Sequence, residues 1–320
     1  IINSTQIDFA DYNSNLTIKE KGTYTLKGNL NHSLIIDSAE DVTLKLNGVT
    51  IKNSMTSAIL NKGTGSLTII LNENTTNILS DGGSNTYDAC IYSKGDLTIT
   101  GPGELFVFGN QEEGEGIATE AKDITIENGK IHIEANDDGL NAGGDRGTIT
   151  INDGEISIKA KGDGIDSNKN LQINGGTIYT YTTSSGGDSG IDTDTGYTIN
   201  GGLVLALGND MLETPLQKSK QYSLSFNLDT KISKGTLITL MDKNDKVLIS
   251  FEALTDFKTL IISTKDLIPG TYYLYQNGIN VGTSYNGIYP SSDYIKGERL
   301  TIAGTDTFTV TSKVTKYGLK

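Results

Sequence analysis

Hydrophobic and polar residues alternate in short segments that recur along the chain up to about residue 214. Alternation with a period of two places every second side chain on one face, so each segment predicts a β-strand with one buried side. One set of strands begins at Leu67, Leu97, Ile124, Ile149, Leu171 and Tyr197. Another set follows a glycine turn, at 129–133, 154–158, 176–180 and 202–206. With the segment that opens each repeat, the pattern predicts three strands per repeat.

The spacing of the repeats indicates the class of fold. Each repeat opens at a small residue followed by Ile or Leu, and these anchors are Ala58-Ile59, Cys90-Ile91, Gly116-Ile117, Gly139-Leu140, Gly164-Ile165 and Gly190-Ile191. Successive anchors lie 23 to 32 residues apart, which suits one coil of a three-sided solenoid with insertions in its loops. Leucine-rich and propeller repeats fit this pattern worse. We therefore predict an all-β fold, with a right-handed parallel β-helix over residues 1–214.

The pattern changes near Pro215. Beyond it, hydrophobic segments such as 224–226, 237–240, 247–251, 260–262 and 272–275 are separated by irregular loops, which predicts antiparallel strands. We expect a C-terminal β-rich module at 215–320 that caps the open end of the solenoid, where unpaired strand edges would invite aggregation. Within the solenoid, Asn152, Asn174 and Asn200 share one turn position and predict a ladder of stacked amides.

The net charge of the chain limits the kinds of partner that it can bind. The chain carries 39 acidic and 26 basic residues, a net charge of −13, so nucleic acid and anionic membranes would be repelled and cations attracted. Cys90 is the single cysteine and lies in an apolar stretch, so we expect a small buried side chain. No apolar run is long enough to predict membrane insertion. Because the chain starts at Ile1 without a signal peptide, we expect the processed form of a secreted or cell-surface protein.

Acidic and amide residues flank the anchors of consecutive repeats. If Leu140, Ile165 and Ile191 point inward, alternation turns the next residues outward as one column: Asn141, Asp166 and Asp192. A second column is expected at Asn168 and Asp194. A third is expected across the glycine corner at Asp138, Asp163 and Asp210, with Asp137 and Asp188 beside it.

These columns predict a calcium site. Stacked strands lie about 4.8 Å apart, and calcium takes oxygen ligands at about 2.3–2.6 Å, so an ion fits between carboxylates of adjacent coils. Without a cation, like charges on neighbouring strands would destabilise the fold. Transition metals are disfavoured, since the cluster supplies only oxygens and the chain has just two histidines, His32 and His132.

Several segments carry a family resemblance: Gly22-Thr-Tyr-Thr-Leu, Leu46-Asn-Gly-Val-Thr-Ile, Asn77-Ile-Leu-Ser-Asp-Gly and Gly162-Asp-Gly-Ile-Asp. Their order resembles the polysaccharide-lyase-like, carbohydrate-binding β-helix proteins of clostridial cell surfaces. The likeness spans most of 20–214 and extends from Gln217 to Tyr275. It implies calcium binding and attachment to plant cell-wall polymers, cellulose and acidic pectic chains such as polygalacturonic acid. The implied calcium ligands are Asp138, Asp163, Asp166, Asp188, Asp192 and Asp194, whereas Asn141 departs from the pattern.

An active pectate lyase is the alternative. In such an enzyme calcium acidifies the proton beside a uronate carboxylate, and a Lys or Arg abstracts it. Alternation turns Lys159 and Lys161 outward, and Lys161 lies two residues before Asp163, so it is the best candidate base, with Lys159 and Arg146 behind it. We favour the interpretation that these cations balance acidic neighbours or hold a substrate carboxylate. An adhesin that recognises a protein is a further alternative.

Aromatic residues suggest where sugars stack. Tyr179 and Tyr181 are predicted to point outward beside the lysines, where their rings could cover the C–H face of a pyranose. An ordinary strand position is the competing interpretation. The chain has no Trp, so affinity would depend on Tyr, hydrogen bonds and calcium.

Overall fold

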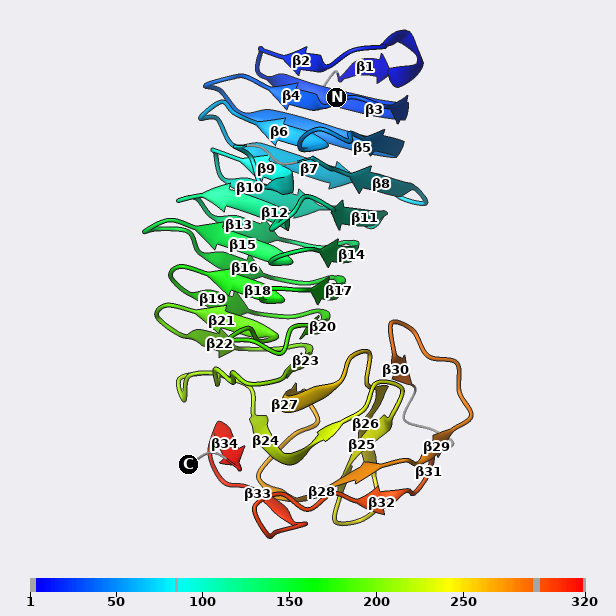
Figure 1. Ribbon diagram of the computed structural model, residues 1–320, viewed down its shortest axis with the longest axis vertical. Coiled ribbons are helices and arrows are strands. Elements are labelled where there is room, and N and C mark those ends of the chain that lie inside the picture. The colour runs from blue at the N-terminus through cyan, green and yellow to red at the C-terminus, as the bar shows by residue number, and fades with distance from the viewer. Residues whose placement is uncertain (1–3, 84–85, 290–293, 319–320) are drawn as a thin grey trace.

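A computed structural model describes residues 4–83, 86–289 and 294–318. It shows a parallel β-helix that leads into a C-terminal antiparallel module (Figure 1). One side of the β-helix is an eight-stranded sheet that holds the anchors. Its strands are β2 (Leu16–Ile18), β4 (Leu34–Ile36), β6 (Ile59–Asn61), β9 (Ala89–Ser93), β12 (Glu115–Glu120), β15 (Leu140–Gly143), β18 (Ile165–Ser167) and β21 (Ile191–Thr193).

The other two sides belong to one 18-stranded sheet. The second side stacks β7 (Leu67–Leu71), β10 (Leu97–Thr100), β13 (Ile124–Ile126), β16 (Ile149–Ile151), β19 (Leu171–Ile173) and β22 (Tyr197–Ile199). The third side stacks β8 (Thr76–Ser80), β11 (Glu104–Gly109), β14 (Lys130–Ala135), β17 (Glu155–Ala160), β20 (Thr177–Thr182) and β23 (Leu203–Gly208). From β6 to β23 each coil therefore has three strands, as the alternation predicted.

The first coils are less regular. They contain β1 (Thr5–Asp8), the short 3-10 helix η1 (Phe9–Asp11), and the long strands β3 (Gly22–Leu30) and β5 (Val42–Lys52), which run across two sides. Phe9 is fully buried and closes this end of the core. Among the described residues, no helix is long and apolar enough to span a membrane.

Aliphatic side chains stack along the inside of the β-helix. Ile99, Ile126, Ile151 and Ile173 face one another in register on the second side and are fully buried. Cys90 is buried in the same core, as predicted. Outside, Asn174 donates to Asn152 at 2.8 Å and Asn200 donates to Asn174 at 2.9 Å, which confirms the amide ladder.

The C-terminal module continues the 18-stranded sheet. The last strand of the third side, β23, pairs antiparallel with β27 (Phe257–Ser263), which pairs with β24 (Ser223–Ile232), and β24 pairs with β34 (Val314–Tyr317). The edge that the solenoid would expose is therefore hydrogen-bonded. The remaining strands of the module are β25 (Leu237–Asp242), β26 (Val247–Glu252), β28 (Gly270–Gln276), β29 (Ile279–Asn280), β30 (Ile288–Tyr289), β31 (Tyr294–Ile295), β32 (Glu298–Arg299) and β33 (Phe308–Val310).

Candidate functional site

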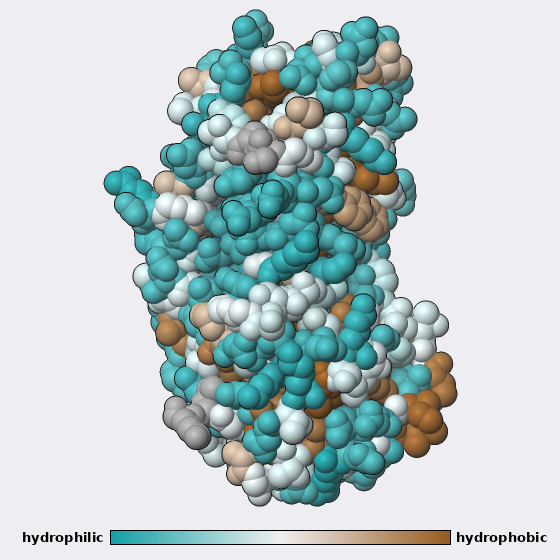
Figure 2. Space-filling model, in the orientation of Figure 1, coloured by the Kyte–Doolittle hydropathy of each residue, from teal (hydrophilic) through white to brown (hydrophobic). Residues whose placement is uncertain are grey.

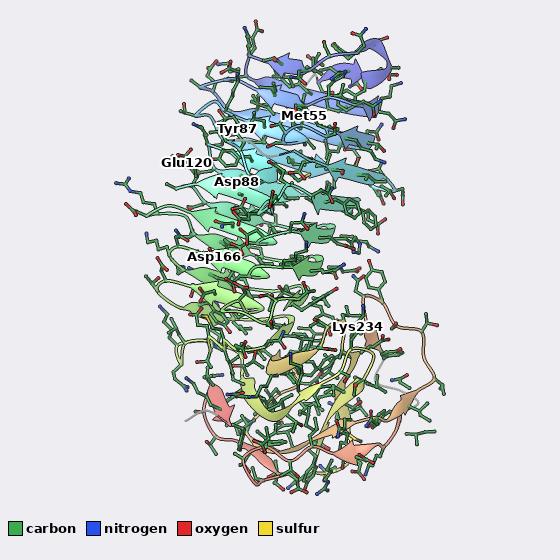
Figure 3. All side chains as sticks on the ribbon, in the orientation of Figure 1. Met55, Tyr87, Asp88, Glu120, Asp166 and Lys234 are labelled. Atoms are coloured by element: carbon green, nitrogen blue, oxygen red, sulfur yellow. The ribbon has the colours of Figure 1, made fainter. Side chains whose placement is uncertain are left out.

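Parallel strands bring the predicted acidic column together. Asn141 of β15 pairs with Asp166 of β18, and Asp166 pairs with Asp192 of β21. The residues before them, Leu140 and Ile165, are fully buried, so the three polar side chains point outward. Figure 3 places Asp166 on the outer surface of the eight-stranded sheet, and Figure 2 shows hydrophilic residues over the middle of the same view. The register confirms this column.

A second column lies just before the strands, next to the anchor glycines. The backbone N–H of Asp163 donates to Oδ1 of Asp138 at 2.7 Å, and the N–H of Ser189 donates to Oδ1 of Asp163 at 2.5 Å. The Asn141 amide joins the two columns, since its Nδ2 donates to Oδ2 of Asp138 at 2.9 Å. Each carboxylate is thus held by the backbone of the following coil.

Glu115 belongs to this column and was not predicted from the sequence. It precedes Gly116 as Asp138 precedes Gly139, and its Oε1 accepts from Nδ2 of Asn141 at 3.4 Å. The signal was present in the anchor pattern, where an acidic residue stands directly before the glycine. We name as the acidic face the residues Glu115, Asp137, Asp138, Asn141, Asp163, Asp166, Asp188, Asp192 and Glu213.

Glu213 closes the acidic face at its C-terminal end. It follows β23, and its Oε1 accepts from Oγ1 of Thr193 at 2.7 Å. Asp210, in contrast, is exposed in the loop after β23, and Ser189 occupies the coil after Asp163. The prediction that Asp210 shares a column with Asp138 and Asp163 is therefore wrong, because the chain leaves the repeat register after the last coil.

The remaining predicted ligands lie around this centre. The backbone N–H of Asn168 donates to Ala142, and that of Asp194 donates to Ser167, so the two residues occupy successive coils beyond the strands. Asp194 is exposed, but its negative charge contributes to raising the pKa of Asp166. The negative charge of the Asp188 carboxylate contributes in the same way to raising the pKa values of Asp137 and Asp163.

Burial and crowding of like charges shift the pKa values of this face upward. Desolvation, followed by the charge of Asp137, raises the pKa of Asp138 to about 8. Desolvation also raises the pKa of Asp163 to about 7 and, together with the charge of Asp192, that of Asp166 to about 6. The pKa of Glu115 rises to about 9 through burial and the charge of Asp88. Removing water and adding negative neighbours both disfavour the ionised carboxylate.

Two further features of the acidic face are relevant to the binding of a cation. Glu115 is 8% exposed, and its Oε2 has no hydrogen-bond partner within the described residues. Gly162 lies against the face in such a way that a Cβ there would overlap Oδ1 of Asp137 and Oδ1 of Asp138. The glycine therefore leaves open a space bounded by two carboxylates.

The donor chemistry of the acidic face suits calcium, since every side-chain donor is a carboxylate or amide oxygen. Within residues 4–83, 86–289 and 294–318, however, no group of three or more His, Cys, Asp or Glu converges on one point as a closed metal cage does. The carboxylates are spread along the stacked coils. Binding an ion here requires some of these side chains to rotate toward it.

The three basic residues considered as candidate bases, Lys159, Lys161 and Arg146, lie in different surroundings. Lys159 forms an ion pair with Glu134 at 3.0 Å, which agrees with its expected role of balancing an acidic neighbour. Lys161 is exposed and, with Lys159 and Asn136, lines a small cavity of about 110 Å³. Arg146 is exposed in the loop after β15, at the opposite end of that strand from Asp138.

Tyr179 and Tyr181 do point outward from β20, but the C-terminal module covers them. Tyr179 is fully buried, its hydroxyl donates to the carbonyl of Glu252 at 2.7 Å, and its ring packs edge-on against Phe251. Tyr181 is 8% exposed in the same hydrophobic cluster. The prediction that these rings stack on sugars is therefore wrong: they hold the module against the β-helix.

The chain is thus a parallel β-helix with a partly buried, stacked array of carboxylates on one side. A family model for carbohydrate-binding domain-containing proteins matches residues 12–237, and the chain belongs to this family. The family match confirms the carbohydrate-binding family that the sequence resemblance indicated.

Two comparisons describe its relatives. The chain is 32% identical over 129 residues to a carbohydrate-binding domain-containing protein from Acetivibrio thermocellus, an alignment that covers 37% of this chain and 44% of that relative. The chain therefore spans less than half the length of this relative. The structure of the polysaccharide lyase-like protein from C. thermocellum, a gadolinium derivative, is 28% identical with a TM-score of 0.48, covering 59% of this chain and 83% of the other.

Proposed function

We propose that this protein binds acidic polysaccharide in a calcium-dependent manner through its acidic face. The observation that carries the proposal is the combination of buried carboxylates with raised pKa values and the unpartnered Oε2 of Glu115. In the described part of the chain, no Lys or Arg forms an ion pair with Asp138, Asp163 or Asp166. A divalent cation would supply the missing positive charge.

The residues nearest the centre of the face would hold the ion. Asp138, Asp163, Asp166 and Asp192 supply carboxylates from successive coils, and Asn141 supplies an amide oxygen. Asp137, Asp188, Asn168 and Asp194 surround them and add negative charge. Bound calcium supplies a positive charge that attracts the carboxylates of a uronate polymer, whereas the bare face repels them.

The polymers that we propose are those of plant cell walls, polygalacturonic acid on the acidic face and cellulose as a further ligand. From this role in attachment to such polymers we also propose that the protein is secreted or lies on the cell surface. Calcium at millimolar extracellular concentration is compatible with a face whose carboxylates are partly exposed.

Calcium titration by calorimetry tests the proposal directly. We expect wild-type protein to bind calcium and to sediment with polygalacturonate in calcium but not in chelator. The double variant Asp163→Ala/Asp166→Ala should lose both properties. Asp210→Ala is the matched control, because it removes an exposed carboxylate from the neighbouring loop and should leave both unchanged. Absence of calcium binding by the wild type would exclude this function for the acidic face.

Lyase activity is the second candidate function, favoured by the position of Lys161 at a cavity two residues before Asp163. A pectate lyase releases unsaturated uronides that absorb in the ultraviolet. If the protein is a lyase, absorbance should rise with polygalacturonate and calcium, and Lys161→Ala should abolish the rise while calcium binding persists. A binding protein sediments with the polymer and releases no product.

A further inference from the structure

A groove runs along a corner of the β-helix, away from the acidic face. It has a volume of about 460 Å³, which lies in the ~300–1,000 Å³ range of ligand sites. Its floor includes Gly129, Gly154 and Gly176, which have φ angles of 132°, 122° and 86°. These positive φ angles favour glycine, and a Cβ at Gly154 or Gly176 would also run into the backbone of the preceding coil, so the stacked turns require glycine.

Polar side chains line the groove. Asn128 and Asp153 accept hydrogen bonds from the N–H groups of the glycines that follow them, at 2.7 and 2.8 Å, so both are held in place. Lys130 and Glu155 lie opposite each other on β14 and β17, with Nζ and Oε2 3.7 Å apart. The lining has two carboxylates and one ammonium group, so it would repel a uronate and accept hydroxyl groups.

The C-terminal module places an aromatic ring at the rim of this groove. Lys130 Nζ lies 5.6 Å from the ring centroid of Tyr285, and Tyr285 is 46% exposed. Burial and the adjacent Glu155 carboxylate raise the pKa of Tyr285 to about 12. Figure 1 shows the segment between β29 and β30 rising from the module toward β17 and β20.

The position of Tyr285 is set by a tight turn. Asn286 and Gly287 have φ angles of 49° and 77°, and Tyr285 and Ile288 exchange backbone hydrogen bonds of 2.9 Å, as in a type I′ hairpin. The turn is anchored on both sides: the Gly287 carbonyl accepts from Glu252 N–H at 2.7 Å, and a Cβ at Gly287 would lie 3.2 Å from the buried Tyr179 ring. Tyr179 therefore helps to position the exposed Tyr285.

We propose that this groove and Tyr285 form a calcium-independent subsite for a neutral pyranose chain, separate from the acidic face. An aromatic ring offers a flat surface to the C–H side of a sugar, and the groove offers carboxylate, amide and ammonium groups to its hydroxyls. The inference rests on the proposed function in one respect, that the ligand of this chain is a polysaccharide.

Calorimetry with cellohexaose, a neutral β-1,4-glucan oligosaccharide, tests the subsite in chelator. Wild-type protein should bind it, and Tyr285→Ala should weaken binding about tenfold, equivalent to about 1.4 kcal/mol. Tyr285→Phe keeps the ring and should stay within about threefold of the wild type. Tyr12→Ala removes another exposed ring, 38% exposed near the N-terminus, and should change nothing.

Thermal unfolding of each variant establishes that the fold is retained. The subsite is refuted if wild type does not bind cellohexaose in chelator, or if Tyr285→Ala binds as tightly as wild type. The proposed function is judged separately on the same proteins: Tyr285→Ala should retain calcium-dependent binding of polygalacturonate, and Asp163→Ala/Asp166→Ala should retain cellohexaose binding. Either site can therefore fail without the other.

Discussion

Two stretches of one outward column on the eight-stranded sheet have opposite chemistry. Toward the N-terminus the column reads Leu60, Tyr92 and Ala118, and in the next coils it continues as Asn141, Asp166 and Asp192. The backbone geometry is the same in both. We call them the apolar stretch and the acidic stretch.

The apolar stretch is covered and stabilises the fold. Leu60 and Ala118 are 5% and 4% exposed, and Tyr92 packs edge-on against Tyr87 with ring centroids 5.1 Å apart. The Tyr92 hydroxyl donates to Glu120 at 3.1 Å, so its polar end is satisfied. Figure 3 places Tyr87 and Asp166 at different heights along the same side. Among the described residues, no aromatic side chain covers the acidic stretch in this way, and the crowding of its carboxylates contributes to the raised pKa of Asp166.

The β-helix thus supplies regular positions, while each coil supplies its own chemistry. A coil adds one side chain to every outward column about 4.8 Å from the last. Apolar side chains at this spacing pack, whereas carboxylates at this spacing repel one another. The outward side chains of one segment of the column can therefore differ from those of the next segment while the buried core behind them stays the same.

The largest expected effect is on the pH dependence of stability without divalent cations. Asp166, Asp163, Asp138 and Glu115 have pKa values raised to about 6, 7, 8 and 9 in the folded protein. A carboxyl with a raised folded-state pKa stabilises the fold below its unfolded pKa, about 4, and that stabilisation is lost as pH rises through the folded value. Denaturant unfolding in chelator should show several kcal/mol of stability lost between pH 5 and pH 9. A curve that rises over this window would contradict the charge crowding.

Calcium should reverse that loss. At pH 8 and a calcium concentration about 100 times the Kd, the free energy of unfolding should increase by about 2.7 kcal/mol. Asp163→Ala/Asp166→Ala should show no increase, and it should be more stable than wild type in chelator because two repelling charges are gone. Thermal unfolding with and without calcium measures both changes. Equal calcium stabilisation of the double variant would place the ion elsewhere.

Leu60→Ala removes a buried side chain from the apolar stretch. Removal of this buried side chain should cost about 2 kcal/mol, the low end for Leu→Ala, because it lies in a small cluster outside the main core. Urea unfolding at several pH values, in calcium and in chelator, should give the same loss throughout. A loss that varies with calcium would mean that the two stretches are coupled.

Gly162→Ala tests the space between the two carboxylates. A Cβ there would overlap Oδ1 of Asp137 and of Asp138, so both side chains must move away. We expect calcium affinity to fall about tenfold, equivalent to about 1.4 kcal/mol. Gly186→Ala is the matched control, because the atom nearest to a Cβ there is the Ser184 hydroxyl at 3.3 Å. If both variants bind calcium like wild type, the space at Gly162 is not part of the site.

The repeating part of this protein follows from its sequence. A period-two pattern decides which side chains point inward, and the coil length places equivalent residues of successive coils side by side. The column Asn141, Asp166, Asp192 and the amide ladder from Asn152 to Asn200 could therefore be predicted. Glu115 could have been predicted by the same rule.

The contacts made where the repeat ends depend on the tertiary structure. The alternation correctly predicted that Tyr179 points outward. The module that buries this residue, however, begins tens of residues later and docks through contacts that no local pattern encodes. After β23 the chain leaves the coil register, so Glu213 rather than Asp210 reaches the acidic face. The position of Tyr285 over Lys130 likewise joins residues from two modules. The alternation of residues determines whether a side chain points inward or outward. Packing between distant parts of the chain determines which residues an outward side chain contacts.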